Sequence, residues 1–155
     1  MQELTPTRTR EYLEQMYQKG KTYSEINIGD SASFTKTITE TDIYLYAGVS
    51  GDFNPMHVDE EYAKQTPFKT RIAHGGLPGA LLAPVLGMKL PGLGTVALEV
   101  TQKYRKPTYP GDTITCAVEV TKKIPRLKAV EMKVLWTNQR GEKISSGTCR
   151  VIPPE

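Results

Sequence analysis

The apolar stretch from Ile72 to Leu90 constrains the fold of this chain more than any other part of the sequence. Between Gly76 and Met88 it leaves no polar face on a helix, and a helix that is apolar all round is buried. Pro78 suits the first turn, because that position needs no amide donor. Pro84 removes a backbone hydrogen bond and crowds the carbonyl group of Ala80. We therefore predict a central buried helix that is kinked or shortened by Pro84.

Segments in which apolar and polar residues alternate account for much of the remaining chain. Alternation with a period of two is the pattern of a half-buried strand, and it is cleanest from Thr113 to Thr121. Gly147 indicates a bulge or a close backbone approach inside the last such segment. Strands that cluster after a buried helix favour an α+β fold with an antiparallel sheet. The other alternating segments are Ser31–Ile38, Val96–Thr101, Val130–Thr137 and Lys143–Ile152.

Two short helices are expected between the first strand and the central helix. Thr39 to Asp42 has the pattern of a capping box, which marks the start of a helix. The second helix begins at Asp59, and Tyr62 and Ala63 are expected to face inward. The first helix has an apolar stripe made of Ile43, Tyr46, Ala47 and Val49.

Composition excludes several classes of protein. The 155 residues suffice for one domain with a substantial core. A net charge of +3, without a long block of like charge, does not indicate a nucleic-acid partner. We expect neither a membrane span nor a secretory signal, because long apolar runs are missing. Cys116 and Cys149 fit no metal-ligand spacing, and we expect reduced thiols in a cytoplasmic protein.

The segment from Ser50 to His57 holds the strongest candidates for chemistry. Asp52 and His57 are five residues apart, a spacing that a helix would not bring to one face. Asn54-Pro55 favours a turn instead, and a tight bend can bring both side chains to one point. A carboxylate and a neutral histidine there could hold a water molecule and move its proton. The alternative interpretation is an Asp-capped turn with a surface histidine.

His74, Gly75 and Gly76 stand directly before the predicted central helix. Exposed amides at a helix N-terminus favour negative charge, and glycine allows a ligand to approach the backbone closely. The alternative is that the two glycines only permit a tight loop into the helix. His74 is expected to stabilise this turn rather than to act as a second base. Two histidines and one aspartate at these spacings give no strong metal signature, so we expect no metal site.

The residues from Tyr46 to His57, with Ala63 following, resemble the hydratase motif of the MaoC-like (R)-specific enoyl-CoA hydratases. A weaker resemblance extends from Tyr23 to Val151. It implies a hot-dog fold, in which an antiparallel sheet wraps around a long, largely apolar central helix. It also implies reversible hydration of a trans-2-enoyl-CoA thioester to (R)-3-hydroxyacyl-CoA.

The resemblance assigns roles to individual residues. Asp52 and His57 are the expected catalytic pair, and the amide of Gly75 is the expected donor to the enolate oxygen. The candidate substrate-binding residues are Asn54, His74 and Gly76, although side-chain bonds that hold the loop are the favoured role of Asn54. No cofactor is expected, because coenzyme A is part of the substrate.

The resemblance also bears on organisation and assembly. Residues 1–22 are expected to be an N-terminal extension, with a short amphipathic helix around Tyr12 to Tyr17, and residues 23–155 the hydratase domain. A homodimer with sites near the subunit interface is implied. Three basic residues could meet coenzyme A phosphates or form a solvated edge: Lys103, Arg105 and Lys106.

Two alternatives and one departure from the family pattern remain. A dehydratase acting on acyl-carrier-protein thioesters would use the same catalytic pair and a different partner surface. A non-catalytic acyl-thioester-binding subunit is a different class, and the presence of both Asp52 and His57 argues against it. Some family members carry a serine at the position that aligns with Ala83, so a supporting hydrogen bond that this serine could make is not expected here.

Overall fold

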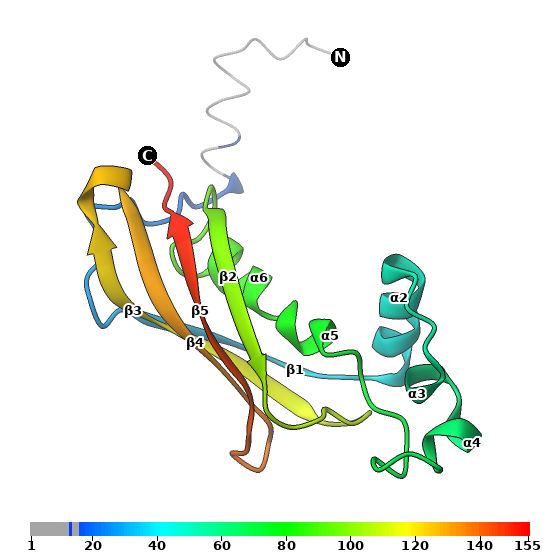
Figure 1. The fold of residues 1–155 in the computed structure, drawn as a ribbon. Helices are drawn as coiled ribbons and strands as arrows, with labels where there is room; N and C mark the ends of the chain where they lie inside the picture. The colour runs from blue at the N-terminus through cyan, green and yellow to red at the C-terminus, as the bar shows by residue number, and fades with distance from the viewer. Residues whose placement is uncertain (1–12, 14–15) are drawn as a thin grey trace, which may run out of the picture.

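A computed structural model describes Leu13 and residues 16–155 of the chain (Figure 1). The helix predicted around Tyr12 to Tyr17 falls largely outside these described residues. The strands are β1 (Ser31–Thr37), β2 (Val96–Tyr104), β3 (Thr113–Ile124), β4 (Ala129–Thr137) and β5 (Lys143–Ile152). The helices are α2 (Glu40–Ser50), α3 (Pro55–Val58), α4 (Glu60–Ala63), α5 (Gly76–Gly79), α6 (Leu82–Met88) and the 3-10 helix η1 (Pro125–Leu127).

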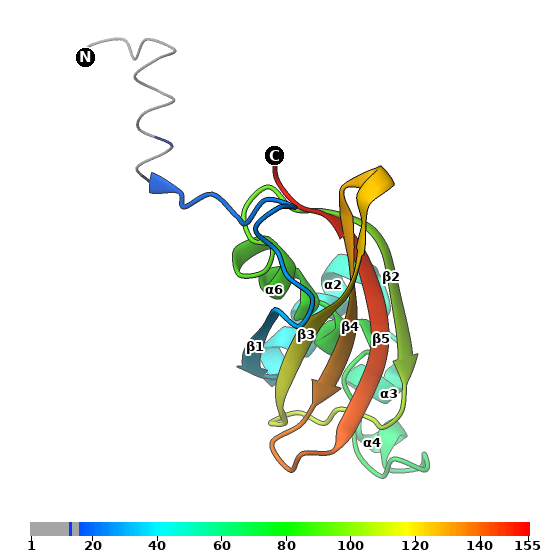
Figure 2. The same ribbon diagram turned by 90° about the vertical axis from the view of Figure 1, so that its left-hand side faces the viewer.

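The five strands form one antiparallel sheet in the order β1-β3-β4-β5-β2. The sheet curves around α5 and α6, which lie on its concave face (Figures 1 and 2). Gly147 packs against the backbone of Thr101, so a side chain at this position would collide with the neighbouring strand. The predicted α+β hot-dog fold and the close approach at Gly147 are therefore confirmed.

The core lies between the concave face of the sheet and the two central helices. The inward-facing residues of β3 and β4 supply most of the core side chains. Burial in this core raises the pKa of the Cys116 and Cys149 thiols to about 12. Both cysteines are free thiols that pack as small apolar residues. The largest core side chains on β3 and β4 are Ile114, Val118, Val120, Val130, Met132, Val134 and Trp136.

The central helix is interrupted, and Pro84 explains where. A turn at Ala80 and Leu81 separates α5 from α6. The carbonyl of Ala80 accepts a hydrogen bond from the amide of Ala83 at 3.0 Å, in place of the missing amide of Pro84. The predicted shortening is confirmed, but burial on all sides is wrong. Ala83 and Met88 are exposed, because the sheet covers only one side of the helix.

The segment between β1 and α4 begins as predicted. Lys36, on the inner side of β1, forms an ion pair with Asp42 at 2.8 Å. Thr39 and Asp42 make both bonds of a capping box at the start of α2. Of the two residues of α4 expected to face inward, Ala63 is fully buried, whereas Tyr62 is 50% exposed and that prediction is wrong. Val49, the last residue of the apolar stripe of α2, is 90% exposed. Short helices that cross the end of a sheet bury only a narrow stripe.

The edge strand β2 is unlike the other long strands. Val96, Leu98 and Val100 are each about half exposed, and no strand of the described sheet pairs with their outer edge.

None of the described helices has the length and apolar character required to cross a membrane.

Candidate active site

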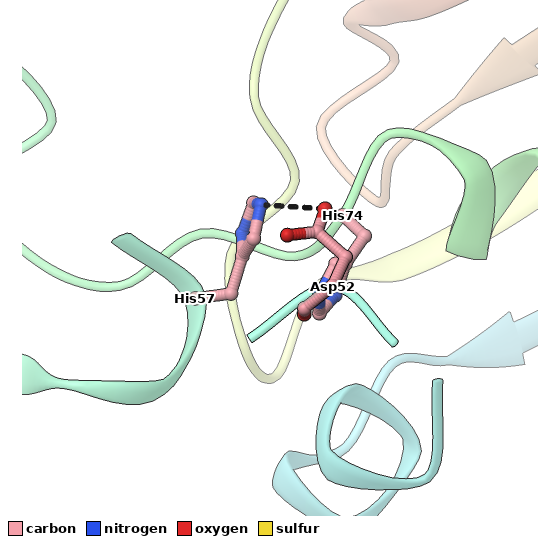
Figure 3. A group of neighbouring side chains, drawn as sticks. All are labelled: Asp52, His57 and His74. Carbon is pink, nitrogen blue, oxygen red and sulfur yellow. Dashed lines mark hydrogen bonds and ion pairs between the residues drawn. The ribbon is translucent and has the colours of Figure 1, made fainter. Parts of the chain in front are cut away.

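A tight turn brings Asp52 and His57 together, as the sequence predicted. The backbone amide of Asn54 donates to Oδ1 of Asp52 at 3.1 Å, and Oδ1 of Asn54 accepts from the amide of Met56 at 3.2 Å. Asn54 thereby caps α3, which begins at Pro55. Oδ2 of Asp52 then lies 4.0 Å from Nε2 of His57 (Figure 3).

His57 is buried, and a hydrogen bond on the side of the ring away from Asp52 fixes its orientation. Its Nδ1 lies 2.7 Å from the carbonyl oxygen of Ile72. A carbonyl can only accept, so Nδ1 carries the hydrogen and Nε2 keeps a lone pair on the side of Asp52. The Asp52 side chain is about half exposed, whereas that of His57 is only 9% exposed. The pair therefore combines a buried acceptor with a carboxylate open to solvent.

His74 packs directly on this pair. Its ring stacks on that of His57 with centroids 3.9 Å apart, and its Nε2 lies 2.8 Å from the backbone carbonyl of Asp52. That carbonyl requires the hydrogen of His74 on Nε2, the opposite tautomer from His57. The bond ties the turn before α5 to the Asp52 loop, and the stacking of the two rings was not foreseen from sequence.

Both glycines after His74 lie against tyrosine rings. A Cβ on Gly75 would come within 2.7 Å of Cε1 of Tyr104, and one on Gly76 would collide with the hydroxyl of Tyr46. The glycines therefore make room for aromatic side chains of this chain. α5 is only one turn long, so it has no long helix dipole, and a negative charge placed here would meet only local amides such as that of Gly75.

A cavity of about 450 Å³ opens beside these groups. Its walls are mostly apolar, with Arg105 and Lys106 also lining it, whereas Lys103 does not. Arg105 and Lys106 of the β2–β3 loop were singled out from the sequence. Pro107 and Thr108 of the same loop and Ile144 and Ser145 of β5 were missed, because no motif marks them. The cavity is lined by His57, Phe68, Ile72, Ala73, Gly75, Gly76, Pro78, Tyr104, Arg105, Lys106, Pro107, Thr108, Ile144 and Ser145.

Asp52, His57 and His74 also form a compact set of potential ligands. One ligand atom from each lies within 4.8 Å of the others, the only such group found among the described residues. The ring nitrogens that face the Ile72 and Asp52 carbonyls are already engaged. What the set offers is a carboxylate, the Nε2 lone pair of His57 and Nδ1 of His74, which is buried without a hydrogen-bond partner among the described residues. The carboxylate and Nε2 of His57 face each other at a distance that suits a water molecule.

Comparison with known proteins gives one consistent family. Residues 24–139 match the family described as MaoC like domain. The (R)-specific enoyl-CoA hydratase of Rhodospirillum rubrum is 44% identical over 132 residues, which cover 85% of this chain and 91% of the relative.

Two solved structures agree with this assignment. The unliganded R-hydratase of Pseudomonas aeruginosa has a TM-score of 0.83 at 40% identity, covering 88% of this chain and 87% of that one. The (R)-hydratase of Aeromonas caviae, involved in PHA biosynthesis, has a TM-score of 0.81 at 30% identity, covering 83% and 98%. The chain is thus a homologue of hydro-lyases. It belongs to the MaoC-like dehydratase family.

Proposed function

We propose that this chain catalyses the reversible hydration of trans-2-enoyl-CoA to (R)-3-hydroxyacyl-CoA. The observation that carries the proposal is the meeting of Asp52, His57 and Gly75 beside one largely apolar cavity. The sequence relationship to (R)-specific enoyl-CoA hydratases supports the substrate class.

The proposed first step is activation of a water molecule between Asp52 and His57. Their facing atoms are 4.0 Å apart, too far for a direct hydrogen bond and suitable for a bridging water. Nε2 of His57 has a lone pair to accept the proton, while the Asp52 carboxylate orients the second hydrogen. The water oxygen bonds to the β-carbon, and a proton is returned to the α-carbon, so one molecule of water is added in total.

The negative charge that builds on the thioester oxygen needs a hydrogen-bond donor. The Gly75 amide is the candidate, since no acceptor among the described residues takes its hydrogen. Removing one donor from a comparable oxyanion hole lowers the rate by about a hundredfold to a thousandfold. Gly76 lines the cavity beside Gly75, and His74 and Asn54 contribute by holding the Asp52 loop.

Loss of absorbance at the enoyl-thioester band of crotonyl-CoA tests the proposal. We expect rapid loss with the wild-type chain and a decrease of roughly 10²- to 10⁴-fold in Asp52→Asn and His57→Ala, because a positioned acid or base contributes that much. Glu61→Gln, a change of an exposed acid on α4, is the matched control and should leave turnover unchanged. The product should be the (R) enantiomer.

Two outcomes would contradict the proposal. Unchanged turnover in either site variant would remove that residue from the mechanism. A folded wild-type chain that fails with acyl-CoA substrates of several lengths, but acts on the acyl-carrier-protein thioester, would identify the dehydratase alternative. Failure with both carriers would favour a binding subunit.

A homodimer is part of the proposal, supported by the exposed edge of the sheet. Unpaired edge strands with apolar side chains are pairing sites, and Val96, Leu98 and Val100 make β2 such a strand. Light scattering should give twice the mass of one chain, and Leu98→Lys should shift the equilibrium toward the monomer. We assign residues 23–155 to the hydratase domain and residues 1–22 to an extension.

A further inference from the structure

We propose that Arg71 is a positioning residue that fixes the ring of His57 in its Nδ1–H tautomer, an inference that rests on the proposed role of His57 as the base. Arg71 belongs to no catalytic motif of the sequence. It sits immediately before Ile72, whose carbonyl group is the partner of His57 Nδ1.

The guanidinium group of Arg71 joins two helices that flank the site. Its Nη2 donates to Glu40 of α2 at 2.8 Å, and its Nε donates to Glu60 of α4 at 3.2 Å. Nη1 donates to the hydroxyl of Tyr44 at 3.0 Å. The side chain is only 14% exposed. Burial opposes its charge, but the bonds to both glutamates outweigh this and raise the pKa of Arg71.

The backbone around Arg71 is fixed by the same glutamate. Glu60 accepts from the Arg71 amide at 3.3 Å and from the Thr70 hydroxyl at 3.0 Å. One residue later, the amide of Ile72 donates to the carbonyl of Met56 at 3.2 Å. The amide of Ala73, which shares a peptide unit with the Ile72 carbonyl, donates to the carbonyl of Thr108 at 2.8 Å. Arg71 and Glu60 therefore hold the chain on the N-terminal side of Ile72, while Met56 and Thr108 hold the two peptide units that flank it.

This orientation decides what His57 can do. A neutral imidazole carries its hydrogen on one nitrogen, and the partner of the other nitrogen selects which. With the Ile72 carbonyl in place, the lone pair lies on Nε2, 4.0 Å from Asp52. If the carbonyl turns away, the Nε2–H tautomer becomes favourable, because it donates to the carboxylate. That tautomer has no lone pair with which to take a proton from water.

The tautomer can be measured directly, because the chain contains only two histidines. In protein labelled with ¹⁵N-histidine, under alkaline conditions that keep histidines neutral, the wild type should show opposite tautomers. His57 should be Nδ1–H and His74 Nε2–H, with His57→Ala assigning the signals. In Arg71→Met, His57 should lose its single tautomer while His74 keeps its own.

Kinetics provide the second readout. We expect kcat for crotonyl-CoA to fall about tenfold in Arg71→Met, a fraction of the 10²- to 10⁴-fold effect of a base, with KM little changed. Arg71→Lys keeps the positive charge but lacks the planar guanidinium group that bonds to both glutamates, so its kcat should lie between those of the wild type and Arg71→Met. Arg150→Met is the matched control. Arg150 also bridges two glutamates, Glu99 and Glu131, but from the opposite face of the sheet, and its loss should change neither readout.

Each outcome separates this inference from the proposed function. A folded Arg71→Met or Arg71→Lys in which His57 keeps the Nδ1–H tautomer would overturn the inference, whatever the rate. A changed tautomer with reduced kcat supports it. A changed tautomer with full turnover supports the positioning role and instead overturns His57 as the base.

Discussion

The curved sheet and the arm formed by residues 40–75 are held by different forces. In the sheet, large apolar side chains from β3 and β4 pack completely out of water. In the arm, three of the five buried apolar residues are alanines. The arm is held instead by helix caps, by carbonyl bonds to His57 and His74, and by the ion pairs of Arg71.

This difference divides stability from site geometry. Apolar burial is non-directional and scales with area, so the sheet resists unfolding without fixing any single atom. Hydrogen bonds and hydrogen-bonded ion pairs are directional, so they place the atoms of the proposed catalytic pair while adding little to global stability. Changes in the sheet should therefore alter unfolding, and changes in the arm should alter turnover.

The largest expected effect is on the sheet side. Trp136→Ala should lower the free energy of unfolding by about 3–5 kcal/mol, as large aromatic truncations in cores do, because Trp136 is fully buried. Urea unfolding measures it. Trp136→Phe should cost less, since it removes less volume and deletes an indole N–H that has no partner among the described residues. If Trp136→Ala remains folded at low temperature but has a greatly reduced kcat, the separation between a stabilising sheet and a site-forming arm would be wrong.

A smaller effect is expected where the arm meets the cavity. Gly75→Ala places a methyl group against the ring of Tyr104, which must then shift within the cavity that both residues line. We expect kcat/KM to fall roughly tenfold, which corresponds to about 1.4 kcal/mol. Tyr104 is exposed and can move, so thermal unfolding should change little. Gly75→Ala with Tyr104→Ala should recover part of the activity. Failure of this rescue would mean that the amide itself, not the aromatic contact, is disturbed.

A loss of about 1 kcal/mol in the stability of α3 is expected from Asn54→Ala, which removes its cap. The Asp52 loop should loosen and kcat should fall several-fold, as steady-state kinetics with crotonyl-CoA would measure. Asn54→Ser keeps a capping oxygen and should restore most of the rate. Equal losses in both variants would instead indicate that the Asn54 amide contacts the substrate.

The smallest effect concerns the sheet side, where the β4–β5 loop meets the β2–β3 loop. Glu142 bonds to Lys106, Asn138 and Arg140, which lower its pKa from 4.5 to about 2. Its contribution to stability is present above its ordinary value of 4.5 and is lost as pH falls toward 2. The difference in melting temperature between wild type and Glu142→Gln should shrink over that range. This difference in melting temperature should be small at every pH, because partly exposed ion pairs contribute little. A difference that does not change with pH would exclude the ion pairs of Glu142 as its cause.

Local patterns predicted much of this molecule because the features that they describe are local. The strand periodicity of β3, the capping box at Thr39, the Asn54-Pro55 turn and the interruption caused by Pro84 each depend on residues within one or two turns. Their physical causes are steric and short-range, so a sequence window contains them. The inward orientation of Tyr62 was predicted wrongly from such a window, because burial depends on which segment packs against the helix.

The sequence by itself determined which groups are available for chemistry: one carboxylate and one imidazole at a bend, and a glycine pair before an apolar helix. Only the tertiary structure decided how they work together. The stacking of His74 on His57 joins residues 17 positions apart, and Arg71 reaches Glu40 across 31 positions. Such contacts arise because packing of the arm against the sheet brings distant segments together, and no local preference encodes which side chains then meet.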